Sequence, residues 1–267
     1  MKKLLVCFSL IFMLTPMFGA CQFHSEKIKV HSLDYASLAY LEPGEFDADQ
    51  SAVWYLPENP YREYACSVSV SNGMLLISND SQERKTYLTQ FDNGYFVGVD
   101  LGEFDGWVKY YPYYSTLPEA GEPKQVSDQN CRGIITKDRR NGYLLTGDTG
   151  GTSGAYQGSI YTLHYSEEEA RWEWDLLETL DELPLAYSYD RERDMLYVAT
   201  SGSVISVSGD NTVTVMVSSD LLKSIGANSV VFWEGSVWCG SPMGVYQYNI
   251  GEKKETWYPM DYQKIIK

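Results

Sequence analysis

Short apolar runs recur along the chain at nearly constant spacing, and each follows an aspartate or another turn signal. The five copies begin near Asp47, Asp92, Asp138, Asp190 and Trp233, so the steps between them are 45, 46, 52 and 43 residues. Within the runs, β-branched and aromatic residues alternate with polar ones, which is typical of half-buried strands. The pattern predicts a chain built almost entirely from strands and tight turns.

The residues between paired runs favour hairpins. Asn-Gly at positions 93–94 and again at 141–142 supplies the positive φ that a two-residue hairpin turn requires. An aspartate placed before such a turn can accept hydrogen bonds from the backbone amides of the turn. We therefore interpret the repeated aspartates as structural residues first and as ligands second.

A repeat of about 40–50 residues whose unit is a β-hairpin is typical of propeller blades. We predict an all-β fold, a single β-propeller of five blades with four antiparallel strands each. Helical periodicity is confined to short turns at 219–225 and 166–170. The blades are expected at residues 33–79, 86–127, 131–177, 184–217 and 227–260.

Two further expectations concern the ring. Residues 27–30 are expected to pair with the third or fourth strand of blade five and so to close the propeller. Because five blades leave a narrow channel, bulky residues on the innermost strands are expected to fill it. A ligand would then bind on one face of the disk.

In this hairpin pattern, residues 30–262 resemble the broad group of bacterial propellers that includes quinoprotein-like and YVTN-type repeats. The Trp-Asp dipeptide of WD repeats and the Asp-box of sialidases are not found where the blades would need them. The resemblance therefore implies a fold and implies no function.

The N-terminus reads as an export signal. Lys2 and Lys3 precede an apolar stretch of 15 residues that ends at Phe18, which is short for a membrane span. The following Gly-Ala-Cys resembles a bacterial lipobox, which implies that Cys21 is lipidated and becomes the mature N-terminus. The expected division is a signal peptide at 1–20, a tether at 21–29 and the propeller domain at 30–262. A plain secretory signal with an incidental cysteine is the alternative.

The net charge limits the kinds of partner that the protein is expected to bind. The net charge is −15, and loss of the two lysines with the signal makes it −17, so nucleic acid and anionic headgroups are excluded as electrostatic partners. Contact with the cell membrane is expected through the lipid anchor, on the extracytoplasmic face.

Cys66, Cys131 and Cys239 fall in different blades and are expected to be buried small hydrophobes rather than disulfides.

No catalytic set, metal site or cofactor site is predicted. The triplet starting at Asp148, Asp-Thr-Gly, lacks the second copy that an aspartic protease needs. A calcium loop beginning at Asp47 has Ala52 in place of the required glycine. His164 lies on a predicted strand and has no ligand at zinc spacing.

A binding site is expected where the two longest connections meet. Residues 112–130 are interpreted as the link from blade two to blade three, and 147–158 as the loop between the second and third strands of blade three. Such connections leave a propeller on the same face, and long loops often carry function. The candidate ligand-binding residues are Tyr113, Tyr114, Glu103, Asp105, Asp148, Tyr156 and Gln157.

Three functions remain open. The leading one is a lipid-anchored propeller that binds a carbohydrate, a peptide or an envelope protein. The first alternative is a five-bladed glycoside hydrolase of the arabinanase type, which would draw its two carboxylates from Asp100, Asp105, Asp148 and Glu103. The second alternative is a scaffold in envelope assembly.

Overall fold

The fold consists of antiparallel sheets in chain order. The structure is a computed structural model, and it describes residues 66–71, 73–79, 86–102, 104–113, 123–148 and 157–259. Four sheets hold four strands each, and a fifth sheet holds two described strands.

Each four-stranded sheet uses four consecutive strands. The first holds β3 (Thr86–Phe91), β4 (Gly94–Leu101), β5 (Phe104–Pro112) and β6 (Lys124–Ser127). The second holds β7 (Cys131–Thr136), β8 (Asn141–Asp148), β9 (Gln157–Ser166) and β10 (Arg171–Leu180). The third holds β11 (Pro184–Asp190), β12 (Met195–Thr200), β13 (Ser203–Ser208) and β14 (Val213–Ser218). The fourth holds β15 (Ser229–Trp233), β16 (Ser236–Ser241), β17 (Gly244–Asn249) and β18 (Lys254–Pro259). Hairpin β1 (Cys66–Ser71) and β2 (Met74–Asn79) makes the remaining sheet.

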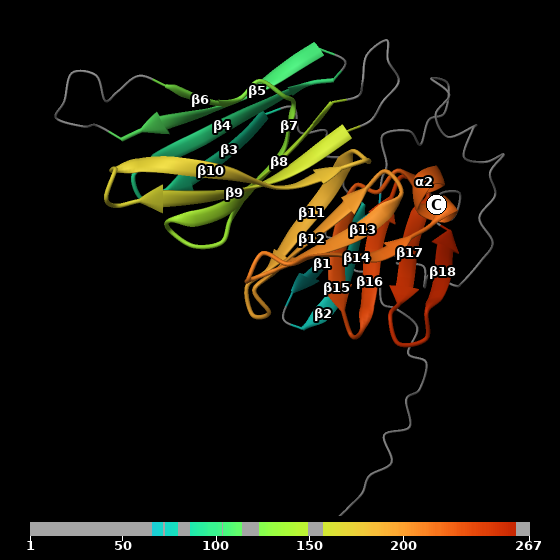
Figure 1. The fold of residues 1–267 in the computed structure, drawn as a ribbon. Helices are drawn as coiled ribbons and strands as arrows, with labels where there is room; N and C mark the ends of the chain where they lie inside the picture. The colour runs from blue at the N-terminus through green and yellow to red at the C-terminus, as the bar shows by residue number, and fades with distance from the viewer. Residues whose placement is uncertain are drawn as a thin grey trace, which may run out of the picture.

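The sheets pack in succession through their first strands. Strand β3 contacts β7, β7 contacts β11, β11 contacts β15 and β15 contacts β1. Figure 1 shows the four large sheets fanned in chain order, from green at the upper left to red at the right. Up-and-down sheets whose first strands face a common centre define a β-propeller. The chain is a single β-propeller of five blades, and blades two to five follow the predicted boundaries closely.

The hairpin β1–β2 takes an inner place that the sequence did not predict. In the predicted blade 33–79 the hairpin comes last, where the outer strands of a blade are expected. In the structure β1 packs against β15, β16 and β17, in the place that a first strand occupies. The Val68 amide donates to Ser229 Oγ at 2.8 Å, which fixes β1 beside β15. Sheet β15–β18 already has four strands, and residues 27–30 lie outside the described residues.

Two aspartates of the repeat, Asp138 and Asp190, hold their hairpin turns as predicted. Asp138 Oδ1 accepts from the amides of Arg140 at 2.7 Å and Asn141 at 2.8 Å. Asp190 Oδ1 accepts in the same way from Glu192 at 3.0 Å and Arg193 at 3.1 Å. The prediction that these residues are structural is confirmed at both positions. Asp47 lies outside the described residues.

The core lies between neighbouring sheets. Between blades two and three, Trp172 meets Phe91 with ring centroids 4.5 Å apart and Phe96 with centroids 5.2 Å apart, both edge to face. Cys66, Cys131 and Cys239 are buried and form no disulfide with one another, in agreement with their predicted role.

The single described helix, α2 (Asp220–Ile225), begins after the N-cap Ser219 and buries Leu222 and Ile225. The predicted helical turn at 219–225 is therefore confirmed. Among the described residues, no helix has the length and apolar character needed to cross a bilayer.

Candidate functional site

The connections between strands leave the propeller on two opposite faces. The face that carries the turns between first and second strands, such as 137–140 and 191–194, is called the hairpin face. The opposite face carries the turns between second and third strands and helix α2, and is called the helix face. Because strands alternate in direction, loops between third and fourth strands also lie on the hairpin face.

Strand β6 lies within residues 112–130, the first of the two long connections, and so changes the face from which that connection leaves. It pairs with β5 as the fourth strand of blade two, so residues 113–123 join the third and fourth strands of one blade. That segment therefore leaves from the hairpin face. The loop after Asp148 joins β8 to β9 and leaves from the helix face. The prediction that the two connections share a face is wrong, because 112–130 contains a strand.

The predicted site residues are therefore divided between the hairpin face and the helix face. The Tyr113 amide donates to Asn93 O at 2.8 Å, at the hairpin end of β4. Asp148 Oδ1 accepts from Asn130 N at 3.2 Å, and Asn130 Oδ1 in turn accepts from Leu101 N at 2.7 Å, at the helix end of β4. The eight residues of β4 separate these ends by about 24 Å, at roughly 3.4 Å per residue. Tyr113 and Asp148 cannot contact one ligand of ordinary size.

Asp148 and Gln157 face each other across β8 and β9 as a register pair, so these two candidates do lie together. Asp148 also accepts from Asn130 Nδ2 at 3.2 Å, which ties the loop before β7 to the end of β8. Tyr114, Tyr156 and Glu103, together with the side chain of Asp105, lie outside the described residues.

A large cavity lies along the first strands. Its volume is about 1510 Å³, and its wall includes residues of β1, β3, β7, β11 and β15. It runs from Asp100 and Asn228 at the helix face to Gly73 and Arg193 at the hairpin face. The expected closure by bulky residues is wrong, because small side chains occupy much of the wall: Ser67, Ser69, Ala186, Ser188 and Ser229.

An ion pair stands in the wall near the helix face. Arg132 Nη1 lies 2.6 Å from Asp100 Oδ2, and the two side chains are 14% and 13% exposed. Arg132 Nε donates to Gly147 O at 3.1 Å, while Nη2 is buried without a hydrogen-bond partner in the described residues. Tyr87 lies in the same part of the wall, and burial raises the pKa of its phenol, so it stays protonated.

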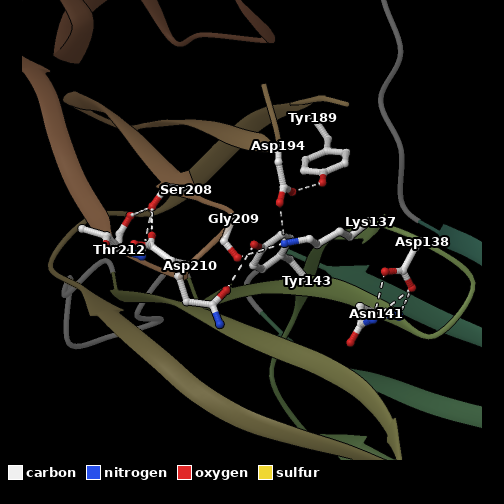
Figure 2. Close-up of polar contacts among 11 residues, drawn as sticks. Lys137, Asp138, Asn141, Tyr143, Tyr189, Asp194, Ser208, Gly209, Asp210 and Thr212 are labelled. Atoms are coloured by element: carbon white, nitrogen blue, oxygen red, sulfur yellow. Dashed lines mark hydrogen bonds and ion pairs between the residues drawn. The ribbon is translucent and has the colours of Figure 1, made fainter. Parts of the chain in front are cut away.

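Near the hairpin face, an ionic contact joins blades three and four (Figure 2). Lys137 Nζ lies 2.9 Å from Asp194 Oδ2 and donates to Gly209 O at 3.0 Å. Asp194 Oδ1 accepts from the hydroxyl of Tyr189, whose residue lines the cavity. These contacts hold the ring of Tyr189 in place.

On the same face, Arg193 pairs with Asp190 at 2.5 Å, and its guanidinium carbon lies 5.4 Å from the ring centroid of Phe232. This pair gives the mouth of the cavity both charge signs and an aromatic surface.

The wall residues were not predicted from the sequence, because the long loops were expected to carry the site. One signal was available. Arg132 interrupts an apolar run, Cys131 to Thr136, that the repeat places at the start of a blade. A charged residue in a first strand faces the centre or another sheet, and either position needs an explanation.

No family model and no curated protein matches the chain. Among solved structures, the WD40 β-propeller domain of Doa1 shares 16% identity over 46% of this chain and 38% of its own, with a TM-score of 0.33. A gluconolactonase from Xanthomonas campestris shares 12% identity over 71% of this chain and 64% of its own, with a TM-score of 0.40. Virginiamycin B lyase from Staphylococcus aureus shares 10% identity over 76% of this chain and 86% of its own, with a TM-score of 0.35. The chain spans less than two thirds of the first two structures.

Proposed function

We propose that the protein is a lipid-anchored binding module on the extracytoplasmic face of a bacterial membrane. Its ligand, a carbohydrate, a peptide or a segment of an envelope protein, would enter the cavity along the first strands. The observation that carries this proposal is the cavity itself, which all five blades line with polar, charged and aromatic groups. Small-molecule sites in proteins are concave in the same way and combine apolar walls with a few placed polar groups.

Lipid anchoring rests on the lipobox-like sequence before Cys21. Replacement of this residue in Cys21→Ser should move the protein from the membrane fraction to the soluble fraction of the cell envelope. Labelling with a radioactive fatty acid should be lost in the same variant. Unchanged membrane retention together with unchanged labelling would contradict the anchor.

Binding in the cavity is tested by filling it. Ser188 lies in the wall on β11, so Ser188→Trp places a bulky ring where the ligand would sit. Ligand binding should fall at least tenfold while the thermal midpoint stays close to that of the unaltered protein. A matched control is Ser224→Trp on the exposed side of α2, away from the wall. Equal binding by both variants would place the ligand outside the cavity.

The hydrolase alternative meets an obstacle in the described part of the wall. Its carboxylates there are Asp100, Asp190 and Glu192. Asp100 is paired with Arg132, and hydrogen bonds from Arg193 and the turn amides outweigh partial burial and lower the pKa of Asp190. A general acid needs a raised pKa. Release of reducing sugar from an arabinan by the purified protein would nevertheless replace binding with hydrolysis.

A further inference from the structure

Among the described residues of the cavity wall the charges cancel, although the chain as a whole is strongly acidic. The chain has 36 acidic and 21 basic residues. The charged residues that the structure describes in the wall are three carboxylates and three guanidiniums: Asp100, Asp190, Glu192, Arg132, Arg191 and Arg193. Two of the possible pairs are already formed, at 2.6 Å and 2.5 Å. An ionic ligand would have to compete with these pairs, whereas an uncharged ligand would leave them intact.

Aromatic side chains cover much of the rest of the wall, and their neighbours hold them in place. A Cβ on Gly133 would lie 2.3 Å from Cε1 of Tyr187, so this ring rests directly on the β7 backbone. Trp233 Nε1 donates to Gly73 O at 3.0 Å. Tyr189 is held by Asp194, as described above. Rings fixed before the ligand arrives lose little conformational entropy on binding.

The wall also offers hydroxyl and amide groups of both hydrogen-bonding kinds. Ser69, Ser188 and Asn228 line the cavity from three different blades, and each can donate and accept. A ligand rich in hydroxyl groups would match this mixture of donors and acceptors.

From these three observations, we propose that the cavity binds a neutral oligosaccharide. The apolar C–H faces of the sugar rings would pack on Tyr187 and Trp233, and the hydroxyl groups would bond to the polar wall residues. The cavity volume of about 1510 Å³ exceeds the roughly 300–1,000 Å³ of small-ligand sites, which favours several sugar rings over one. This inference rests on the proposed function, because it takes the cavity to be the binding site.

The test uses the full chain, purified in a mild detergent. It is screened against immobilised neutral trisaccharides of glucose, xylose, arabinose, mannose and N-acetylglucosamine, against an oligogalacturonide, and against a library of short peptides. Hits are measured by isothermal titration calorimetry. We expect at least one neutral trisaccharide to bind, with a Kd that changes less than twofold between 0.05 and 0.5 M NaCl, since no charge is exchanged.

Variants assign the binding to the wall. Tyr187→Ala should weaken binding at least tenfold. Tyr111→Ala, whose ring stacks on Tyr95 outside the cavity wall, is the matched control and should bind as the unaltered protein does. If Tyr187→Ala unfolds, Ser188→Trp gives the same readout by blocking the cavity.

The possible failures are distinguishable. Binding of the oligogalacturonide or a peptide alone, blocked by Ser188→Trp, would overturn the neutral oligosaccharide and leave the proposed function standing. Binding of a neutral trisaccharide that Ser188→Trp and Tyr187→Ala do not affect would overturn the cavity as the site, and with it both proposals.

Discussion

In two hairpins, a single aspartate stabilises the turn by accepting hydrogen bonds from its backbone amides. Asp138 and Asp190 stand at equivalent places in blades three and four, and each accepts hydrogen bonds from two amides of its own turn. In both turns the carboxylate oxygen satisfies donors that the strand ladder cannot reach. This shared chemistry explains why the repeat could be recognised by an aspartate at fixed distance from an apolar run.

Removal of the Asp138 carboxylate should loosen its turn. Asp138→Ala leaves two amides without their acceptor, so the free energy of unfolding should fall by about 1 kcal/mol. Asp138→Asn keeps an acceptor oxygen and should lose less than half of that. Urea denaturation of the three proteins measures the difference. Equal stability of the alanine and asparagine variants would contradict the role of the oxygen.

Asp194 should make the junction between blades three and four sensitive to acid. Hydrogen bonds from Tyr189 and then Lys137 lower the pKa of this carboxyl below its ordinary value of 3.8. A lowered pKa gives stability that is present above pH 3.8 and is lost as the pH falls through the folded value. Because the side chain is 45% exposed, solvent screens the effect and it should be modest.

The measurement is the urea midpoint between pH 6 and pH 2.5. The unaltered protein should lose more stability over this range than Asp194→Asn, which has no carboxyl to titrate. Lys137→Met should shift the loss toward higher pH, since it removes one of the groups that lower the pKa. Identical pH profiles for all three proteins would rule out this contribution.

At the scale of elements, neighbouring sheets approach so closely that some strand positions have no room for a side chain. Gly98 on β4 faces Cys131 on β7, and a Cβ on Gly98 would lie 2.2 Å from the sulfur and 2.5 Å from Cβ. The side chain of Cys131 in blade three thus packs directly on the Gly98 backbone of blade two. Burial here also raises the pKa of the Cys131 thiol to about 12, so it stays protonated.

Gly98→Ala should therefore push these two blades apart. Overpacking of this kind costs about 1–3 kcal/mol, more than a strand gains when alanine replaces glycine. Gly251→Ala is the control, because its nearest neighbour would be Asn249 Oδ1 at an ordinary 3.5 Å. Urea midpoints at unchanged slope measure the loss. A Gly98→Ala protein as stable as the control would mean that β4 and β7 can separate without cost.

The sequence patterns predicted which residues form strands better than they predicted where each strand lies in the fold. Alternation in Val213 to Ser218 and the Asn-Gly turns predicted blades two to five, since each signal is local. Strand β6 has the sequence Lys-Gln-Val-Ser, with a single apolar residue. The pattern therefore did not show that a strand divides residues 112–130. The inner position of β1 depends on contacts with β15, far along the chain, and no local pattern encodes it. The expectation that the connections 112–130 and 147–158 share a face was wrong because the short strand β6 was not recognised.

At the scale of the whole molecule, packing between sheets holds the described part together without covalent cross-links. Its three cysteines are buried, lie in three different blades and form no disulfide with one another. Successive sheets contribute to shared clusters, such as the one in which Val68 and Ile77 pack with Trp238 and Tyr258. Stability should then depend on burial rather than on redox state.

Reduction should leave the thermal midpoint unchanged. Scanning calorimetry of the purified protein with and without excess dithiothreitol should give midpoints within about 1 °C, whereas loss of a native disulfide would cost about 2–5 kcal/mol. Iodoacetamide labelling before and after denaturation supplies a control, since the thiols should react only once exposed. A clear fall in the midpoint on reduction would reveal a bridge that the described residues do not contain.

The division of the cavity wall among separate sheets has an evolutionary consequence. Ser69, Ser188 and Ser229 stand on three different blades, and each strand is hydrogen-bonded into its own sheet. Substitutions on distant, independent elements tend to be additive. The ligand preference of the cavity could therefore change through substitutions in one blade at a time. Each substitution would leave the wall residues of the other blades in place. Descendants of one ancestral ring could in this way come to recognise different molecules while their hairpin repeats remain recognisably the same.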